Sequence, residues 1–499
     1  MKKLIFIWIN FIFGSLHAAP KDDFVIDVDV DSAFTIYDHL SIKSYNYNVD
    51  CNDDGIFEAT SLTGAYTCEY DLAGRYTIRI SDNSGSGVGF TGVEFARGIQ
   101  STNAQQVVEL KQWGTHRWTD MSRMFVYCSN MVVTASDHPD LSGVSRMSSM
   151  FFLASIANVD VSDWDVSNVR DMSAMFSWIN GWTPNVANWD VSNVQDMSRM
   201  FSRSSNMALD VSQWDVSSVT DMSSMFFRTL KINPDVSNWD TSGVENMSSM
   251  FESAINANPD VADWNVSHVI FMNKMFRQTN RANPDVSNWD VGRVISMREM
   301  FEQTTLANPD VSQWDVGSVT DMSKMFKEAF NATPDVSLWD VSGLRSMSEM
   351  FNRAVRANPD VSLWNVSNVQ IAAGMFEEAL SANPNVSHWD TASLTNANRM
   401  FAYTIFASPN LENWNISNLQ LAENMFLGTA LYTHLYDDLL ESWSERAIPG
   451  KQVIFGAGHS NYCDALNSKE LLQSNGWIIS DAGQDCLNDV FFAHGFELF

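Results

Sequence analysis

The sequence predicts an α/β solenoid, in which strand–helix units of 25 residues stack in one row. Two observations lead to this fold class. A Met-Phe pair returns every 25 residues from Met150-Phe151 to Met425-Phe426. A tryptophan returns with the same spacing at eleven positions: Trp164, Trp189, Trp214, Trp239, Trp264, Trp289, Trp314, Trp339, Trp364, Trp389 and Trp414. A fixed period of this length is typical of repeats that bury their apolar faces only by stacking.

The first half of a repeat has the spacing of a strand. In the repeat 235–259, Val236, Trp239 and Thr241 follow the pattern L-x-x-L-x-L, which marks the strand of a leucine-rich repeat. Asp240, between Trp239 and Thr241, points to the opposite face. We therefore expect a parallel sheet with neighbouring tryptophans about 4.8 Å apart, within a right-handed, leucine-rich-repeat-like solenoid.

The second half of a repeat has the spacing of a helix. Val244, Met247, Met250 and Phe251 are three or four residues apart, one face of an α-helix. Asn258-Pro259 ends the run, because a proline disfavours helix in the residue before it. Each helix should cover the sheet, so that tryptophans and methionines form the core. One buried indole removes roughly 200 Å² from water, about 5 kcal/mol as an upper bound.

Changes in sequence character divide the chain into four segments: 1–18, 19–110, 111–430 and 431–499. The first is a secretory signal peptide, with two lysines before an apolar run. The second is a small all-β module, with alternating runs at 24–28, 45–49 and 76–80. The third holds the repeats. The fourth is an α/β cap and tail over the last repeat, with helices expected near 436–443 and 468–472 and a strand near 476–480.

Composition narrows the classes of function. The net charge is −30, which repels phosphate backbones and anionic membranes and argues against a nucleic-acid partner. After the signal peptide no apolar run is long enough for a transmembrane helix. No zinc-protease, serine-hydrolase, phosphate-loop or C-x-x-C motif occurs. We expect no enzyme, no catalytic residues and no transmembrane span.

A row of acidic residues follows the tryptophans and is the candidate binding site. We name it the acidic strip, and its members are Asp165, Asp190, Asp215, Asp240, Asp290, Asp315, Asp340 and Asp390. In the other three repeats the position is held by Asn265, Asn365 and Asn415. On the strand model these carboxylates project from the open sheet, where they could bind a protein or a glycan. The alternative is that each one accepts backbone N–H groups of its own turn.

A second candidate site lies in the N-terminal module. Asp50, Asn52 and Asp54, followed by Gly55, match the start of a calcium loop. The twelfth position is Ser61 instead of glutamate, so the full EF-hand pattern fails. Calcium at these three residues and a plain β-turn are both open, and no other cofactor is expected.

The cysteines fit an exported protein. Cys51 and Cys68 flank the calcium-loop hairpin, and Cys463 and Cys486 form a second pair in the C-terminal segment. Disulfides persist in oxidising compartments, so both pairs are disulfide candidates.

The repeat Asp-Val-Ser-x-Trp-Asp-Val-Ser-x-Val-x-Asp-Met-Ser-x-Met-Phe resembles that of the BspA-type leucine-rich-repeat surface proteins, a class first described as a domain of unknown function in Mycoplasma lipoproteins. The lead-in Gln112 to Trp118 is similar to that family's entry segment. Tyr45 to Gly55 and Tyr70 to Ile80 resemble the PKD-like module that often precedes it. The resemblance implies a solenoid on or outside the cell surface that binds host or neighbouring-cell components, and it implies no catalytic residues.

The sequence therefore predicts a secreted or surface-exposed bacterial binding or adhesion protein, with an extracellular protein or glycan as its partner. The alternative is an extracellular structural scaffold without a specific ligand.

Overall fold

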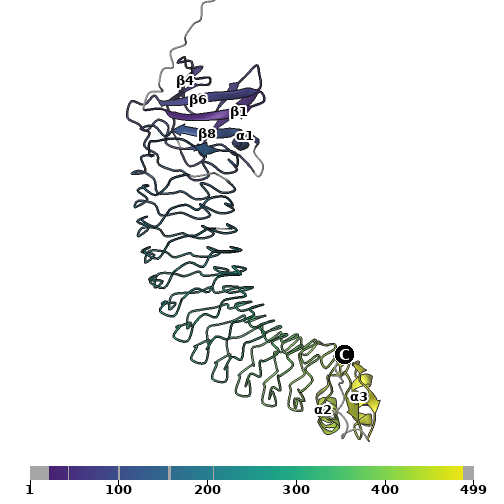
Figure 1. Cartoon of the computed structure of the whole chain (residues 1–499). Helices are drawn as coiled ribbons and strands as arrows, with labels where there is room; N and C mark the ends of the chain where they lie inside the picture. The colour runs from purple at the N-terminus through teal and green to yellow at the C-terminus, as the bar shows by residue number, and fades with distance from the viewer. Residues whose placement is uncertain (1–21, 43, 99–101, 155–158, 206, 487–499) are drawn as a thin grey trace, which may run out of the picture.

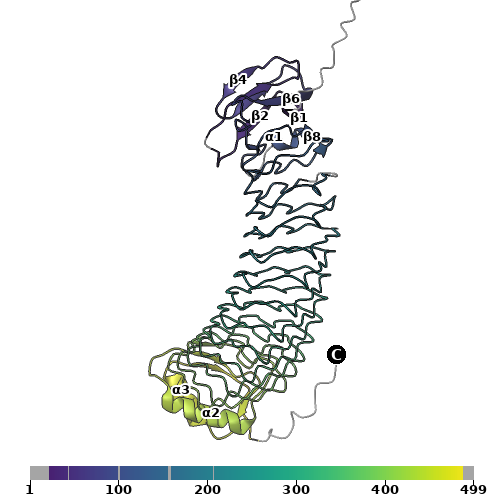
Figure 2. The same ribbon diagram turned by 90° about the vertical axis from the view of Figure 1, so that its left-hand side faces the viewer.

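The computed structural model describes residues 22–486 except 43, 99–101, 155–158 and 206. The predicted signal peptide, 1–18, lies outside the described residues. Figure 1 shows a β module at one end, a long curved stack of similar coils, and a smaller cap at the other end. Figure 2, turned by 90°, shows the same coils stacked one above another.

The N-terminal module is built on two sheets. Its elements are β1 Phe24–Val30, β2 Ala33–Asp38, β3 Tyr47–Asp50, β4 Ala59–Leu62, β5 Tyr66–Glu69, β6 Gly74–Asp82, β7 Val93–Glu94, α1 Thr102–Gln105, β8 Val107–Gln112 and, at the start of the stack, β9 Val132–Val133. The larger sheet has the order β4-β3-β6-β1-β8-β9, and the smaller one β5-β2-β7. The three predicted strand runs coincide with β1, β3 and β6, whose inward side chains, such as Phe24, Tyr47 and Ile78, are buried.

The predicted helices of the repeats are absent. In the described part of the array, the segments expected to be helical consist of successive turns, and the helices of the described chain are α1, α2 Thr433–Arg446 and α3 Leu466–Ser474. The prediction of an α/β solenoid of strand–helix repeats is therefore wrong. The repeats do stack, but each one is a helix-free coil joined to its neighbours by isolated parallel β-bridges, such as Asp221↔Asn246 and Asn246↔Phe271.

The hydrogen bonds explain why a helix does not form. The N–H groups of Met247, Ser249, Phe251 and Ser253 donate to carbonyls of the next repeat at 2.7–3.0 Å. Between them, the N–H groups of Met250 and Glu252 donate to the carbonyls three residues back, at 3.2 and 3.1 Å, and the Ser248 N–H donates to the side-chain oxygen of Asn246 at 3.0 Å. Every second donor is thus used between coils. A helix would satisfy the donors too, but it would leave neighbouring coils joined by side chains alone.

The backbone conformation fits this pattern. Two non-consecutive positions of each repeat have positive φ, as at Ser249 (57°) and Ser253 (58°). Such left-handed residues turn the chain back after each short step, and residues with a Cβ adopt them at a cost of about 1–2 kcal/mol each. Among the described repeats, glycine takes this place at Gly374 (61°) and Gly428 (70°). The string of turns still directs Met247, Met250 and Phe251 inward, where all three are buried.

The tryptophans form the predicted buried row, but not on a sheet. The segment of Val236 to Thr241 is a turn, closed by a bond from Trp239 N–H to the Val236 carbonyl at 3.2 Å. All eleven indoles are at most 5% exposed. Where neighbouring indoles stack, their centroids lie 6.3–6.5 Å apart instead of about 4.8 Å. From Trp189 onward each indole N–H donates to a carbonyl 28 residues earlier, at 2.8–3.1 Å.

The stack of coils is curved (Figure 1), and ring spacings that differ between its two sides fit a curved stack. On the Met-Phe side the backbones bond directly, and the stacked phenylalanine rings are 5.3–5.9 Å apart. On the tryptophan side the spacing is wider. A stack bends toward its closer side, so we call the Met-Phe side the inner face and the tryptophan side the outer face.

The cap continues the stack. Its strands are β10 Leu421–Ala422, β11 Ile454–Gly456, β12 Asn461–Tyr462, β13 Ile478–Ser480 and β14 Gly483–Gln484, with parallel orders β10-β11-β13 and β12-β14. The predicted C-terminal helices and strand correspond to α2, α3 and β13. Trp443 of α2 donates its indole N–H to the Leu411 carbonyl at 3.2 Å, which extends the tryptophan row by one step.

Candidate functional site

The acidic strip lies on the outer face, one carboxylate per repeat. Each of its eight aspartates is exposed and follows a buried tryptophan. Because the coils are nearly identical, their turns repeat in register and the carboxylates follow the axis of the stack. The three asparagines of this row, Asn265, Asn365 and Asn415, occupy the same place in their turns, where they accept the same backbone bond at 3.0–3.2 Å.

Each aspartate of the strip fixes its own turn. Its Oδ1 accepts the N–H two residues later at 2.9–3.1 Å in all eight repeats. Within the described chain its Oδ2 has no hydrogen-bond partner. The sequence left two roles open for each aspartate, closing its own turn or binding a partner. Oδ1 closes the turn, whereas Oδ2 faces solvent, where a partner could reach it.

Hydrogen bonds within the turns lower the pKa of three carboxylates of the strip. The Ser192 hydroxyl and backbone N–H hold the pKa of Asp190 below its ordinary value, and the equivalent serines lower the pKa of Asp240 and Asp340. A hydrogen bond to the charged form favours that form. The lowered pKa favours the charged form of these three carboxylates in acidic surroundings.

A second acidic row runs beside the strip. Its members accept the N–H two residues later at 3.0–3.4 Å, and they are Asp210, Asp235, Asp260, Asp285, Asp310, Asp335 and Asp360. Between two repeats the outer face contains a groove of about 310 Å³ lined by residues that include Gln213, Asp215, Asn238 and Asp240. The outer face thus offers two lines of negative charge, with a shallow hollow between these two repeats.

The inner face carries an ion-pair ladder that we did not predict. Arg277 contacts Glu252 one repeat before it at 2.8 Å and Glu302 one repeat after it at 2.5 Å. Further along, Arg353 contacts Glu378 at 2.9 Å and Glu328 at 3.5 Å, each one repeat away. The sequence signal for this ladder is a pair of opposite charges one 25-residue period apart. The signal can be recognised only when the repeats are aligned and the side chains of this column are known to face solvent.

The candidate calcium loop lies between β3 and β4. The structure brings Asp50 and Asp54 together and adds Glu58, with carboxylate oxygens of the three within 4.8 Å of one another. Calcium prefers a dense set of oxygen donors of this kind. Glu58 lies eight residues after Asp50, so the EF-hand spacing, which ends at Ser61, misses it.

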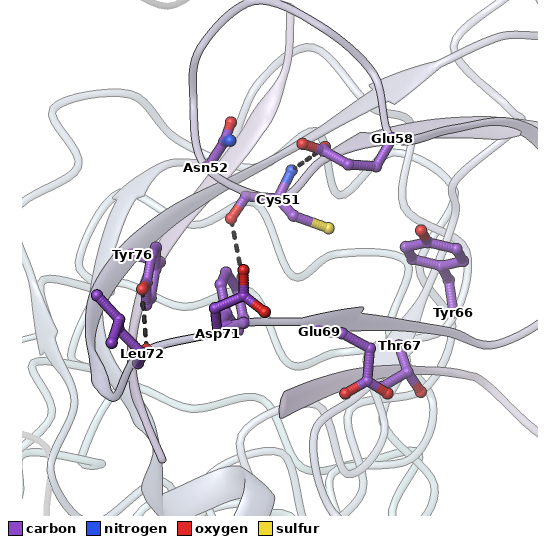
Figure 3. Close-up of a pocket in the computed structure, with 10 residues that line it drawn as sticks. Cys51, Asn52, Glu58, Tyr66, Thr67, Glu69, Asp71, Leu72 and Tyr76 are labelled. Carbon is purple, nitrogen blue, oxygen red and sulfur yellow. Dashed lines mark hydrogen bonds between the residues drawn. The ribbon is translucent and has the colours of Figure 1, made fainter. Parts of the chain in front are cut away.

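The same loop is also a complete turn without an ion. Asp50 is buried and accepts the N–H groups of Asn52, Asp54 and Gly55 at 2.9–3.3 Å. Asn52 accepts the Asp54 N–H through its side-chain oxygen at 3.1 Å. Figure 3 shows the Glu58 carboxylate beside the backbone N–H of Cys51, to which it bonds at 2.7 Å, at the rim of an open pocket of about 460 Å³. The geometry is compatible with calcium and does not require it.

Both predicted disulfides are present. Cys51 is bonded to Cys68, and Cys463 to Cys486. The first links the calcium-loop hairpin to β5, and the second closes the C-terminal cap. Among the described residues, no helix is long and apolar enough to cross a membrane.

The sequence model of a family described as "Mycoplasma protein of unknown function, DUF285" matches four overlapping stretches, residues 94–208, 177–288, 254–361 and 329–443. The chain belongs to the DUF285 family. Together the matches run from the end of the β module to α2, so membership of DUF285 is carried by the repeats. No curated protein matches the chain.

Proposed function

We propose that this DUF285 chain is a secreted or surface-exposed binding protein that presents the acidic strip to an extracellular protein or glycan. The observation that supports this most directly is the solvent-facing Oδ2 of each strip carboxylate. A periodic row of unpaired negative charge suits a partner that has positive or hydroxyl groups at several positions. The two disulfides are compatible with an oxidising, extracellular setting.

The resemblance to BspA-type surface proteins and the PKD-like character of the N-terminal module support the same proposal. Both remain our interpretation, since the family match concerns the repeats and names no activity. A member of such a surface class would act by adhesion and not by catalysis.

A second candidate is an extracellular scaffold without a specific ligand. The nearly uniform coils favour it, because identical outward surfaces repeated many times can serve as a spacer. The two candidates differ in one measurable property, which is saturable binding.

The test is a screen of residues 19–499 against glycans and extracellular-matrix proteins, with and without calcium. The informative variant replaces Asp190, Asp215 and Asp240 by asparagine. The natural asparagines of this row close the same turn, so the fold should be retained while three charges are lost. We expect the affinity for the partner to fall at least tenfold.

The matched control makes the same change in the adjacent acidic row, at Asp210, Asp235 and Asp285. It should leave the affinity nearly unchanged. If both triple variants bind as the unaltered protein does, the acidic strip is not the binding site. If no saturable ligand is found at all, the scaffold is the better description.

A further inference from the structure

A group of arginines on the inner face lies against aromatic rings. Arg203 lies over the ring of Trp178, with the guanidinium carbon 4.6 Å from the ring centroid, and 5.2 Å from that of Phe227. Arg228 lies 5.1 Å from the Phe227 centroid. Arg199 precedes Arg203 on the same inter-coil ladder and is exposed. We name these five residues the cationic patch.

Within the described chain the three arginines of the patch form no ion pair. This is unusual in a protein with 60 acidic and 30 basic residues. A few repeats further along the same face, Arg277, Lys327, Arg353 and Arg399 all pair with glutamates. The inner face therefore neutralises these four cations with glutamates but leaves the three arginines of the patch without such a partner.

An acidic column in neighbouring positions of the array does not pair with the patch. Asp171, Asp196 and Asp221 follow one another through parallel bridges, with Arg146 3.6 Å from Asp171 at one end and Asn246 donating to Asp221 at 3.2 Å at the other. None of the three carboxylates forms an ion pair with an arginine of the patch. The positive charge of the patch is consequently available to a partner.

The arginines of the patch repeat from one coil to the next, and the same coils contain a groove. Successive coils here are separated by the spacing of their stacked phenylalanine rings, 5.8 and 5.9 Å. Arg203 and Arg228 therefore repeat at about one coil. In the same coils a groove of about 480 Å³ is lined by Met207, Leu209 and Lys231 among others, with no acidic residue in its lining. Cations one coil apart fit a polymer that carries an anionic group on successive units.

We propose that the cationic patch binds an anionic polysaccharide, with carboxylate or sulfate groups on the guanidinium groups and sugar rings against Trp178 and Phe227. Guanidinium forms paired, charge-assisted hydrogen bonds with such planar or tetrahedral oxyanions. The exposed parts of the aromatic rings provide apolar surface for the C–H groups of a pyranose. The acidic strip lies on the opposite, outer face, so this site operates without any ligand at the strip.

The positive charge of the patch could also attract an acidic peptide, a single-stranded nucleic acid or the acidic strip of a second copy of the chain. The interleaved aromatic rings and the coil-to-coil spacing favour a sugar polymer over a peptide.

The experiment measures binding of residues 19–499 to size-defined oligosaccharides of heparin and alginate by calorimetry at two salt concentrations. Polyglutamate, a single-stranded DNA oligonucleotide and neutral dextran serve as comparison ligands. We expect saturable binding of at least one anionic oligosaccharide that weakens with salt, and no binding of dextran. The double variant Arg203→Gln, Arg228→Gln should lower the affinity at least tenfold, and Trp178→Ala at least threefold.

The matched control is Arg353→Gln, since Arg353 is an exposed arginine of the same face and column but is already paired with Glu378. Its affinity should equal that of the unaltered chain. Circular dichroism and thermal unfolding confirm that the patch variants fold. Equal losses in the control and the patch variants, tighter binding of polyglutamate or DNA than of either oligosaccharide, or salt-dependent self-association abolished by the patch variant would each overturn the proposal.

Discussion

Replacing Ala174 by glycine should stabilise the protein. Ala174 holds the first left-handed position of its repeat, with φ 53°, and its N–H donates to the Ser198 carbonyl at 2.8 Å. A residue with a Cβ in this conformation costs about 1–2 kcal/mol. Glycine removes that cost but loses more backbone entropy on folding, by about 0.5–1 kcal/mol. The difference leaves a gain of about 0.5–1 kcal/mol in the free energy of unfolding.

The sign of this effect distinguishes the observed coil from the helix that the sequence predicts. In a helix, Ala to Gly costs about 1 kcal/mol. Gly374 offers the reverse change at the same position of another repeat, where φ is 61°. Gly374→Ala should therefore destabilise, although the added Cβ would approach only flexible side-chain atoms of Glu349 and Glu377, at 3.2 Å each.

The assay is urea denaturation of residues 19–499 followed by far-ultraviolet circular dichroism. The midpoint should rise for Ala174→Gly and fall for Gly374→Ala, with an unchanged slope. If Ala174→Gly lowered the free energy of unfolding by about 1 kcal/mol, the left-handed turn would be refuted and the predicted helix would be favoured. Opposite signs for the two variants are the expected result.

Three further perturbations test other parts of the structure. Trp314→Phe removes the indole bond to the Val286 carbonyl, 2.9 Å long, and should lower the free energy of unfolding by about 1 kcal/mol; Trp314→Ala should cost about 3–5 kcal/mol, and equal losses in urea denaturation would contradict the division between bond and packing. Replacing Cys51 and Cys68 by serine opens a loop with a sequence separation of 17; thermal unfolding should show the β module destabilised by about 3 kcal/mol and the array unaffected. The pKa of Asp190, Asp240 and Asp340 is lowered in the folded chain by serine hydroxyls and N–H groups, so their contribution to stability is present above the unfolded pKa of about 3.9 and is lost as the pH falls through the lower folded value. Asparagine at these three positions should flatten the acid limb of a stability–pH curve, and an unchanged limb would count against the turn bonds.

The repeat, its core residues and its two capping segments could be predicted from the sequence, because apolar residues report which positions are buried. Trp239, Met247 and Phe251 are buried as expected. The backbone conformation could not be predicted. A spacing of three and four residues also arises when left-handed residues reverse the chain twice in each repeat, and Ser249 or Ser253 carries no sign of positive φ. Only Gly374 and Gly428 hint at it.

The candidate functional site could also be predicted only in part. The aspartate row and its turn-forming alternative were both visible in Asp240-Thr-Ser, since an aspartate followed by a small polar residue commonly closes a turn. That one oxygen closes the turn and the other remains in solvent is a matter of geometry. Glu58 was not predicted because the EF-hand spacing does not include it. The cationic patch was missed because Trp178, Arg203 and Arg228 become neighbours only through the stack.

The two ends of the stack are both closed by hydrogen bonds. At one end the Arg117 N–H bonds to the Gly87 carbonyl at 2.9 Å and β8 pairs with β9; at the other, the Phe426 N–H bonds to the Gly456 carbonyl at 3.0 Å. Among the described residues, the first and the last coil of the array are each paired with a capping segment, which limits the unpaired edge onto which another molecule could add its own coil. The number of coils between these closures is therefore free to vary, and a gene that gains or loses one 25-residue block would change the reach of the protein without opening it to polymerisation.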